Sequence, residues 1–336
     1  MRPSGGSTPR TDYTIMNEHV NRQQLYEEVI NARRELMRSL MFLSDRETTQ
    51  VPVHADWTVR DVISHIAARE CTVLAAVRHL AEDGEPRFMT PQDDRVFNLG
   101  AVSRRRDLGL PEVLDELEGT RQLLLRYIRR LPNRDLYAEF PVGNSHGSQT
   151  TAHALQEMIA HDFEHAEGIW QWRAAQGLLH RQDFRSYFAG ERLQFLNALG
   201  GMHEDDMVEV PVCGHWTVRD VMCHVLSWDQ EALHTAQKWS EARPWQDEAL
   251  YDDEWNETEV ARRADLNVID LADGLATYHR KLLQHFDELS DAELAATSIA
   301  PWGERMSLLG FYYEMAIHDA AHRPHLLALQ DQLDAG

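Results

Sequence analysis

Apolar residues recur along this chain with the spacing of amphipathic helices. They stand three, four or seven positions apart, the interval at which side chains return to one face of an α-helix. In the first half these stripes cover Leu25 to Leu43, Val62 to Leu80, Val113 to Leu131, and about Gln149 to Trp172. In the second half they cover Phe184 to Leu199, Val218 to Trp239, Val268 to Leu289, and Met306 to Leu329. No convincing alternation typical of strands is present, so the pattern predicts an all-α protein with four helices in each half.

The two halves repeat each other. The segment Pro52–His65 recurs as Pro211–His224 with nine of fourteen residues identical and an offset of 159. Two more anchors follow in the same order: Phe97-Asn98 with Trp255-Asn256 at an offset of 158, and Glu157–His165 with Glu314–His322 at an offset of 157. Ordered anchors at a nearly constant offset indicate duplication of a whole domain.

The anchors and stripes set the expected domain limits. We expect a disordered leader at 1–16, a first bundle at 17–176 and a second bundle at 181–332. The junction falls near Gln176 to Arg181, where Gly177 can end a helix. In each half, roughly twenty-five residues separate the second and third helices, which is too long for a tight turn and predicts a crossover along a four-helix bundle.

Composition narrows the class of protein. With 33 Lys and Arg against 55 Asp and Glu, the net charge is -22, which disfavours nucleic acid and anionic membranes as partners. The three cysteines form no CxxC pair, and no stretch is apolar enough for a signal peptide or a membrane span. We therefore expect a cytoplasmic protein.

Each half carries three histidines that the helical pattern brings together. They are His65, His161 and His165 in the first half, and His224, His318 and His322 in the second. His65 and His224 lie beside an apolar stripe and should point inward, and the H-x3-H spacing puts the other two rings on one helix face. Three neutral nitrogens would hold a divalent metal and leave coordination positions open, as in catalytic sites. Such ligands suit zinc, nickel, copper and iron alike.

Carboxylates stand close to these histidines in the sequence. Glu157 and Glu314 lie four residues before an H-x3-H pair and are the candidate catalytic residues. Each could act as a fourth ligand, as a base for metal-bound water or as an anchor that orients a ligand, or could simply be solvated. Asp162 and Asp319 point about 100° away from the neighbouring histidine, so salt bridges are expected for them.

The repeated Trp-Thr-Val-Arg-Asp segment has a structural explanation. Thr58 with Asp61, and Thr217 with Asp220, fit a capping box at a helix start. The preceding tryptophans, Trp57 and Trp216, would then pack the start of the helix against the core. Cys223 is expected to be a buried, unreactive thiol.

These motifs together resemble the DinB-like superfamily of metal-binding four-helix bundles. The likeness covers about Arg22 to Ala174 and again Asp183 to Leu329. It implies an up-down-down-up bundle that binds zinc, nickel or iron through the two histidine triads. Members include thiol-dependent maleylpyruvate isomerases, mycothiol and bacillithiol S-transferases and self-resistance proteins, so a low-molecular-weight thiol is a further candidate cofactor.

One position distinguishes the two halves. His161-x3-His165-x-Glu167 is similar to the iron motif of ergothioneine-type sulfoxide synthases, but the lectin-like second domain of those enzymes is missing. The second half has Pro324 at the place of Glu167, and proline removes a helical hydrogen bond. We therefore expect unequal sites, with His161→Ala removing more activity than His318→Ala.

Three functional hypotheses follow. The first is a metal-dependent enzyme that activates a thiol or water for transfer, isomerisation or hydrolysis on a small molecule. The second is a non-catalytic protein that sequesters a metal or metabolite, and the third is a hydrogen-bonded histidine core without metal. The sequence leaves open whether the chain is a monomer with an internal pseudo-dimer or a homodimer.

Overall fold

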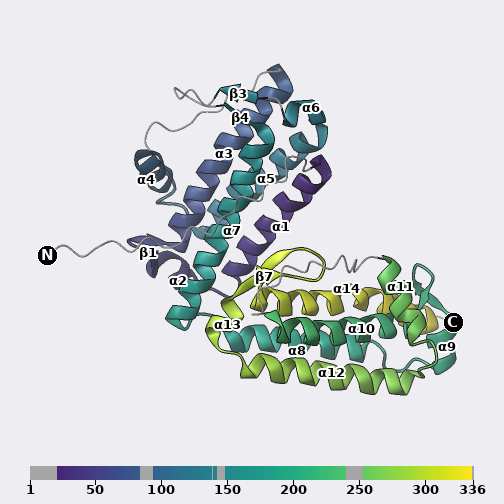
Figure 1. Ribbon diagram of the computed structural model, residues 1–336. Coiled ribbons are helices and arrows are strands. Elements are labelled where there is room, and N and C mark those ends of the chain that lie inside the picture. The colour runs from purple at the N-terminus through teal and green to yellow at the C-terminus, as the bar shows by residue number, and fades with distance from the viewer. Residues whose placement is uncertain (1–20, 84–93, 138, 142–147, 240–252, 335–336) are drawn as a thin grey trace.

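The computed structural model describes residues 21–83, 94–137, 139–141, 148–239 and 253–334. The predicted leader at 1–16 lies outside these residues. Helices dominate the described chain, and they form two bundles that lie across each other (Figure 1). The all-α prediction is confirmed, whereas the up-down-down-up order of the helices stays a prediction.

The first bundle has four long helices. They are α1 (Arg22–Leu40), α3 (Val59–Asp83), α5 (Leu110–Arg130) and α7 (Thr151–Gln176). Short helices lie between them: α2 (Asp45–Gln50), α4 (Asp94–Arg104) and α6 (Asn133–Leu136). Helix α1 packs on α7, α3 packs on α5, and α3 also contacts α7. The predicted crossover therefore contains a helix of its own, α4, which the apolar pattern did not predict.

The second bundle repeats this arrangement. Its long helices are α8 (Arg181–Asn197), α10 (Val218–Gln237), α12 (Val268–Glu288) and α14 (Leu308–Asp334). Its short ones are α9 (Glu204–Glu209), α11 (Asp253–Arg262) and α13 (Asp291–Ala295). Helix α8 packs on α14 and α10 on α12, which are the pairs that correspond to those of the first bundle.

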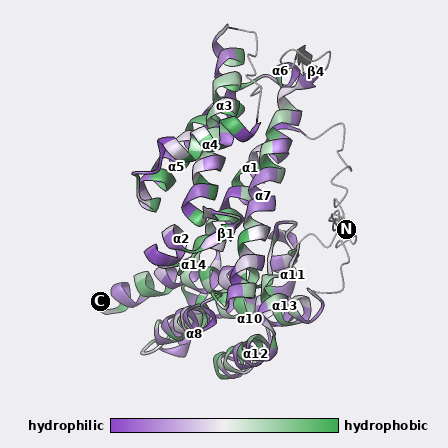
Figure 2. Ribbon diagram, turned by 90° about the vertical axis from the view of Figure 1, so that its left-hand side faces the viewer, coloured by the Kyte–Doolittle hydropathy of each residue, from purple (hydrophilic) through white to green (hydrophobic). Residues whose placement is uncertain are grey.

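Apolar and polar residues mix along the long helices in Figure 2, and the buried apolar ones form the core of each bundle. In the first bundle Leu25, Val29, Leu124 and Leu155 are fully buried in one cluster. Gly177 ends α7 in the left-handed conformation, with φ 67°, as expected for a glycine after a helix. Among the described residues, no helix combines the length and the apolar character needed to cross a membrane.

Four small antiparallel hairpins contradict the expectation of no strands. They pair β1 (Pro52–His54) with β2 (Trp57–Thr58), β3 (Glu139–Pro141) with β4 (Ser148–Thr150), β5 (Pro211–Cys213) with β6 (Trp216–Thr217), and β7 (Thr297–Ile299) with β8 (Arg305–Ser307). With two or three residues each, these strands are too short to show a period of two.

The second strand of each Trp-Thr hairpin leads directly into a long helix. Thr217 accepts from the backbone N–H of Asp220 at 3.3 Å, and the Asp220 carboxylate accepts from the Thr217 N–H at 2.9 Å. Thr58 and Asp61 make the same two bonds at 3.4 and 3.0 Å. The predicted capping boxes are confirmed, and they fix where the histidine-bearing helices α3 and α10 begin.

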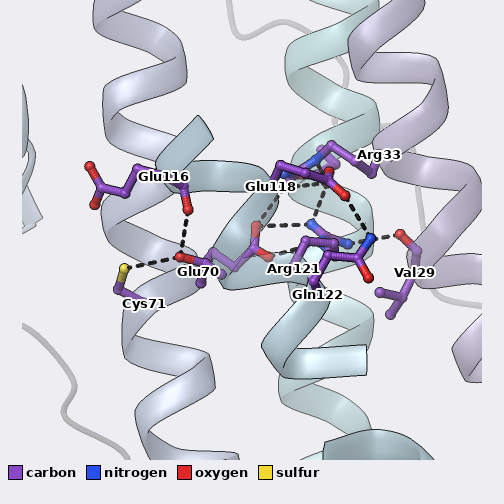
Figure 3. Close-up of polar contacts among 10 residues, drawn as sticks. Val29, Arg33, Glu70, Cys71, Glu116, Glu118, Arg121 and Gln122 are labelled. Carbon is purple, nitrogen blue, oxygen red and sulfur yellow. Dashed lines mark hydrogen bonds and ion pairs between the residues drawn. The ribbon is translucent and has the colours of Figure 1, made fainter. Parts of the chain in front are cut away.

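A buried ion network joins the four long helices of the first bundle. Arg33 of α1 and Arg121 of α5 both bind Glu70 of α3, at 2.5 and 2.8 Å, and both also bind Asp162 of α7. Figure 3 shows Arg33, Glu70 and Arg121 meeting between the helices. Two guanidinium groups and two carboxylates balance in charge, which buried ions require. The expectation that Asp162 forms salt bridges is confirmed.

The second bundle has a different network at the aligned positions. Arg192 binds Asp229 at 2.5 Å and Asp319 at 2.7 Å, so the salt bridge expected for Asp319 is confirmed too. His279 stands at an offset of 158 from Arg121, and neither of its ring nitrogens has a hydrogen-bond partner among the described residues. With neutral His279, one arginine faces two carboxylates. Burial raises the pKa of both, that of Asp319 to about 6.

Replacing His279 with phenylalanine should make the protein more resistant to acid. Burial, and then the charges of Arg192 and Arg185, lower the pKa of His279 from 6.5 to about 3. Below pH 6.5 the unfolded chain binds a proton there and the folded chain does not, so stability falls as the pH falls toward 3. When the pH is lowered from 7.5 to 5.5, the free energy of unfolding of wild type should fall by about 1 kcal/mol more than that of His279→Phe. Urea denaturation at the two pH values measures this difference.

The matched control is His203→Phe, at the exposed histidine that directly precedes the short helix α9. This control should show no such gain. An equal gain for both variants, or none for His279→Phe, would refute the assignment of the acid sensitivity to His279.

The two bundles meet through polar contacts. Glu35 of α1 is only 1% exposed, and its Oε1 accepts from the Trp170 indole N–H and from the backbone N–H of Ser307, both at 2.8 Å. Burial raises the pKa of Glu35. At Gly310 an added Cβ would stand 3.1 Å from the Glu35 carboxylate, so a glycine permits this close approach of α14 to α1.

Candidate metal centres

In the first bundle the three predicted histidines converge. His65 comes from α3, and His161 and His165 come from one face of α7. The Nε2 atom of His161 lies 2.9 Å from that of His65 and 3.0 Å from that of His165. One nitrogen of each ring falls within 4.8 Å of the others. The predicted meeting of two helices at these rings is confirmed.

The second bundle builds the same arrangement. The Nε2 atom of His318 on α14 lies 2.8 Å from that of His224 on α10 and 3.2 Å from that of His322. In the described part of the chain these two triads are the groups of three or more His, Cys, Asp or Glu residues close enough to share a metal ion.

The geometry of both triads fits a divalent ion. Nitrogens bound at about 2.0–2.1 Å to one ion are separated by roughly 3 Å, as these Nε2 atoms are. Burial, and then the charges of neighbouring histidines, lower the pKa of His161 and His224 to about 3. The rings are therefore neutral at pH 7 and present lone pairs to one point, as metal ligands require.

The first triad has a charged residue beside it. Trp57 lies near His65 with ring centroids 5.6 Å apart. Arg69, one turn after His65, places its guanidinium 5.1 Å from the centre of the Phe97 ring and donates to Asp94 and to Asn98. Helix α4, which carries Asp94, Phe97 and Asn98, therefore packs on α3 at the turn that follows His65.

The second triad has aromatic residues at the corresponding places. Trp216 lies 4.9 Å from the His224 ring, and Trp228 lies 6.1 Å from the His318 ring. Trp228 donates to Asn256 and contacts the rings of Trp255 at 4.9 Å and Trp302 at 5.9 Å. Indole rings therefore border this triad where the first has a guanidinium.

Arg69 and Trp228 had no role in the sequence interpretation, although a signal for them was present. Each stands four residues after the first histidine of its triad, which places it one helical turn further along the same face. The offset of 159 also pairs them with each other. The Asn98 and Asn256 anchors of the repeat lie close to the triads, since each side chain favours the protonated form of the nearby His65 or His224.

The two candidate catalytic glutamates lie in different surroundings. Glu157 has a side chain that is 62% exposed and accepts from Gln149 at 2.5 Å. Glu314 is bound by Arg38 of the first bundle, with Nε to Oε1 at 3.0 Å. Neither belongs to the groups of described side chains that could share an ion. A catalytic role for either stays a prediction.

Glu167 and Pro324 do not change the spacing of the triads. Glu167 forms an ion pair with Arg305 of β8 at 2.8 Å, so it contributes to the contact between the bundles. Pro324 lies inside α14, yet the Nε2 distances of the second triad agree with those of the first within 0.2 Å. The expected difference in activity between the two sites stays a prediction.

Two of the three cysteines, Cys71 and Cys223, do not supply a reactive thiol. Cys223 is buried and contacts the backbone carbonyl of Arg263, and burial raises its pKa to about 11. Burial also raises the pKa of Cys71, which contacts Thr120. The expectation that Cys223 is a buried thiol is confirmed, and its high pKa keeps it protonated at pH 7.

Comparison with known protein families matches each half separately. Residues 30–164 match the family model of the mycothiol maleylpyruvate isomerase N-terminal domain, and residues 187–326 match the DinB superfamily. The first match includes His161 of the H-x3-H pair, and the second includes both His318 and His322. The two matches, in the same order as the two repeats, are consistent with two DinB-like domains in tandem. Neither the curated proteins nor the solved structures gave a match to this tandem DinB-like chain.

Proposed function

We propose that each DinB-like domain binds one divalent ion, zinc, nickel or iron, through its histidine triad, and that the protein is a metal-dependent enzyme acting on a small molecule. The observation that carries this proposal is the convergence of three neutral imidazoles in each domain, one buried and two half-buried, with the central Nε2 atom 2.8–3.2 Å from the other two. Three ligands leave positions for a substrate, as in catalytic zinc sites.

Such an ion holds a bound thiol or water in its deprotonated, nucleophilic form at neutral pH. The chain supports this chemistry by its own residues: the histidines hold the ion, while the Trp57 ring packs beside His65. Since burial raises the pKa values of Cys71 and Cys223, and no cysteine belongs to either triad, we propose that the thiol comes from a cosubstrate. The match to a family named for mycothiol supports a low-molecular-weight thiol in this role.

The two glutamates are assigned different roles. Glu157 is exposed, and its polar contacts within the described chain are with Gln149 and His153 rather than with a cation of fixed charge, so it can accept a proton from a bound thiol or water. Glu314 is held by Arg38 across the contact between the domains. We therefore propose Glu157 as the base of the first site and Glu314 as a residue that fixes the second domain against the first.

The test combines metal analysis with turnover. Protein purified without a histidine tag should contain transition metal, and the loaded protein should convert mixtures of a low-molecular-weight thiol and an electrophile over many turnovers. Stoichiometric binding without continued product release would instead show sequestration. Less than about a tenth of an equivalent of metal per chain would refute a metal site.

A further inference from the structure

The two triads are alike, but the residues beside them differ in charge. At the position one turn after the first histidine, the first domain has Arg69 and the second has Trp228. We propose that the first site takes an anionic ligand, held by Arg69, and the second takes an uncharged ligand with a flat aromatic group, held by Trp228 and its neighbouring indoles. This assignment rests on the proposed metal sites and adds the class of ligand to each.

Several contacts support an anion at the first site. Arg69 is half-buried and stands four residues after His65, which places it one helical turn further along the same face of α3. Its hydrogen bonds to Asp94 at 2.6 Å and Asn98 at 3.4 Å both use Nη2. The Asp94 side chain is 72% exposed, and such a pair contributes little. The guanidinium therefore has donors left for a carboxylate.

The Phe97 ring holds the Arg69 guanidinium in place. The guanidinium lies over the Phe97 ring at 5.1 Å, which restricts its motion on the side of α4. A planar cation held against an aromatic face presents its remaining N–H groups outward in a fixed fork. A small acid bound at the metal through a thiolate would place its carboxylate within reach of this fork.

The second site is bordered by indole rings instead. Trp228 lies near the triad and near two further indoles, since its ring is 6.1 Å from His318, 4.9 Å from Trp255 and 5.9 Å from Trp302. All three tryptophans are partly exposed, whereas core aromatic residues of this domain such as Phe188 and Phe286 are almost fully buried. Aromatic faces favour stacking with flat apolar groups.

The test uses cobalt(II)-loaded variants that each keep one intact triad. His318→Ala keeps the first site and His161→Ala keeps the second. Each is titrated with mercaptoacetate, an anionic thiol, and with benzyl mercaptan, an uncharged aromatic thiol, and binding is followed by the thiolate-to-cobalt absorption band. The first site should bind mercaptoacetate more tightly, and the second should bind benzyl mercaptan more tightly, each by at least about tenfold.

Exchange of the aligned residues then reverses the preference. Arg69→Trp in the first site should favour benzyl mercaptan, and Trp228→Arg in the second should favour mercaptoacetate. The milder variants Arg69→Gln and Trp228→Phe should weaken binding of the preferred thiol alone, and circular dichroism reports whether each variant is folded. The same order of affinities at both sites, or an exchange without effect, would overturn the assignment.

Two further outcomes separate this inference from the proposed function. If no cobalt band forms, the metal sites are wrong, and calorimetric titration of the metal-free variants with both thiols decides the ligand assignment by itself. Opposite preferences there would uphold it, and absence of binding would overturn it. Tighter binding of cysteamine, a cationic thiol, than of benzyl mercaptan at the second site would also overturn it.

Discussion

His161→Ala and His318→Ala are each expected to lower the metal content from about two equivalents per chain to about one, and the double variant should bind almost none. Each substitution removes the central ring of a triad, whose Nε2 contacts both other nitrogens at 2.8–3.2 Å. Two imidazoles cannot hold the ion as three do, since the third ligand closes one face of it. Inductively coupled plasma mass spectrometry of tag-free protein measures this directly.

His153→Ala is the matched control, because His153 lies on the same helix α7 but its side chain is 43% exposed and outside the triad. It should keep both equivalents. If His318→Ala keeps both equivalents while His161→Ala loses one, the second triad does not bind metal. In turnover assays His161→Ala should lose more activity than His318→Ala, and the reverse order would refute an impaired second site.

Arg192→Met should lower the free energy of unfolding by about 3–5 kcal/mol, because it leaves two buried carboxylates without their cation. Arg192 binds Asp229 at 2.5 Å and Asp319 at 2.7 Å, and neither carboxylate is exposed. Burial already raises the pKa of Asp319 to about 6, and loss of the guanidinium would raise it further. The variant should therefore be least stable relative to wild type above pH 7. Urea denaturation with a metal chelator present measures the change.

Arg185→Met tests the same chemistry on the surface of the same helix. Arg185 pairs with Asp287 at 2.7 Å, but both side chains are at least a third exposed. Exposed pairs contribute about 1 kcal/mol or less, so this control should change stability little. Equal losses for the two arginines would show that the buried network is not what stabilises the second domain.

The sequence by itself determined the elements that depend on local periodicity. The 3.6-residue period predicted the long helices, and the near-constant offset predicted the duplication that the two family matches support. The H-x3-H spacing alone placed His161 and His165 on one helix face, because residues four apart lie one turn from each other. The capping boxes could also be predicted, because Thr58 and Asp61 are three residues apart and interact within one turn.

What only the tertiary structure decided depends on residues far apart in the chain. Glu167 and Glu314 looked like site residues by proximity, but both pair with arginines of the other domain, 138 and 276 residues away. No local period reports such contacts, because they form only when the bundles pack. The difference between Arg69 and Trp228 beside the triads likewise depends on tertiary contacts. Phe97 of α4 lies against Arg69, and the Trp255 and Trp302 rings lie against Trp228.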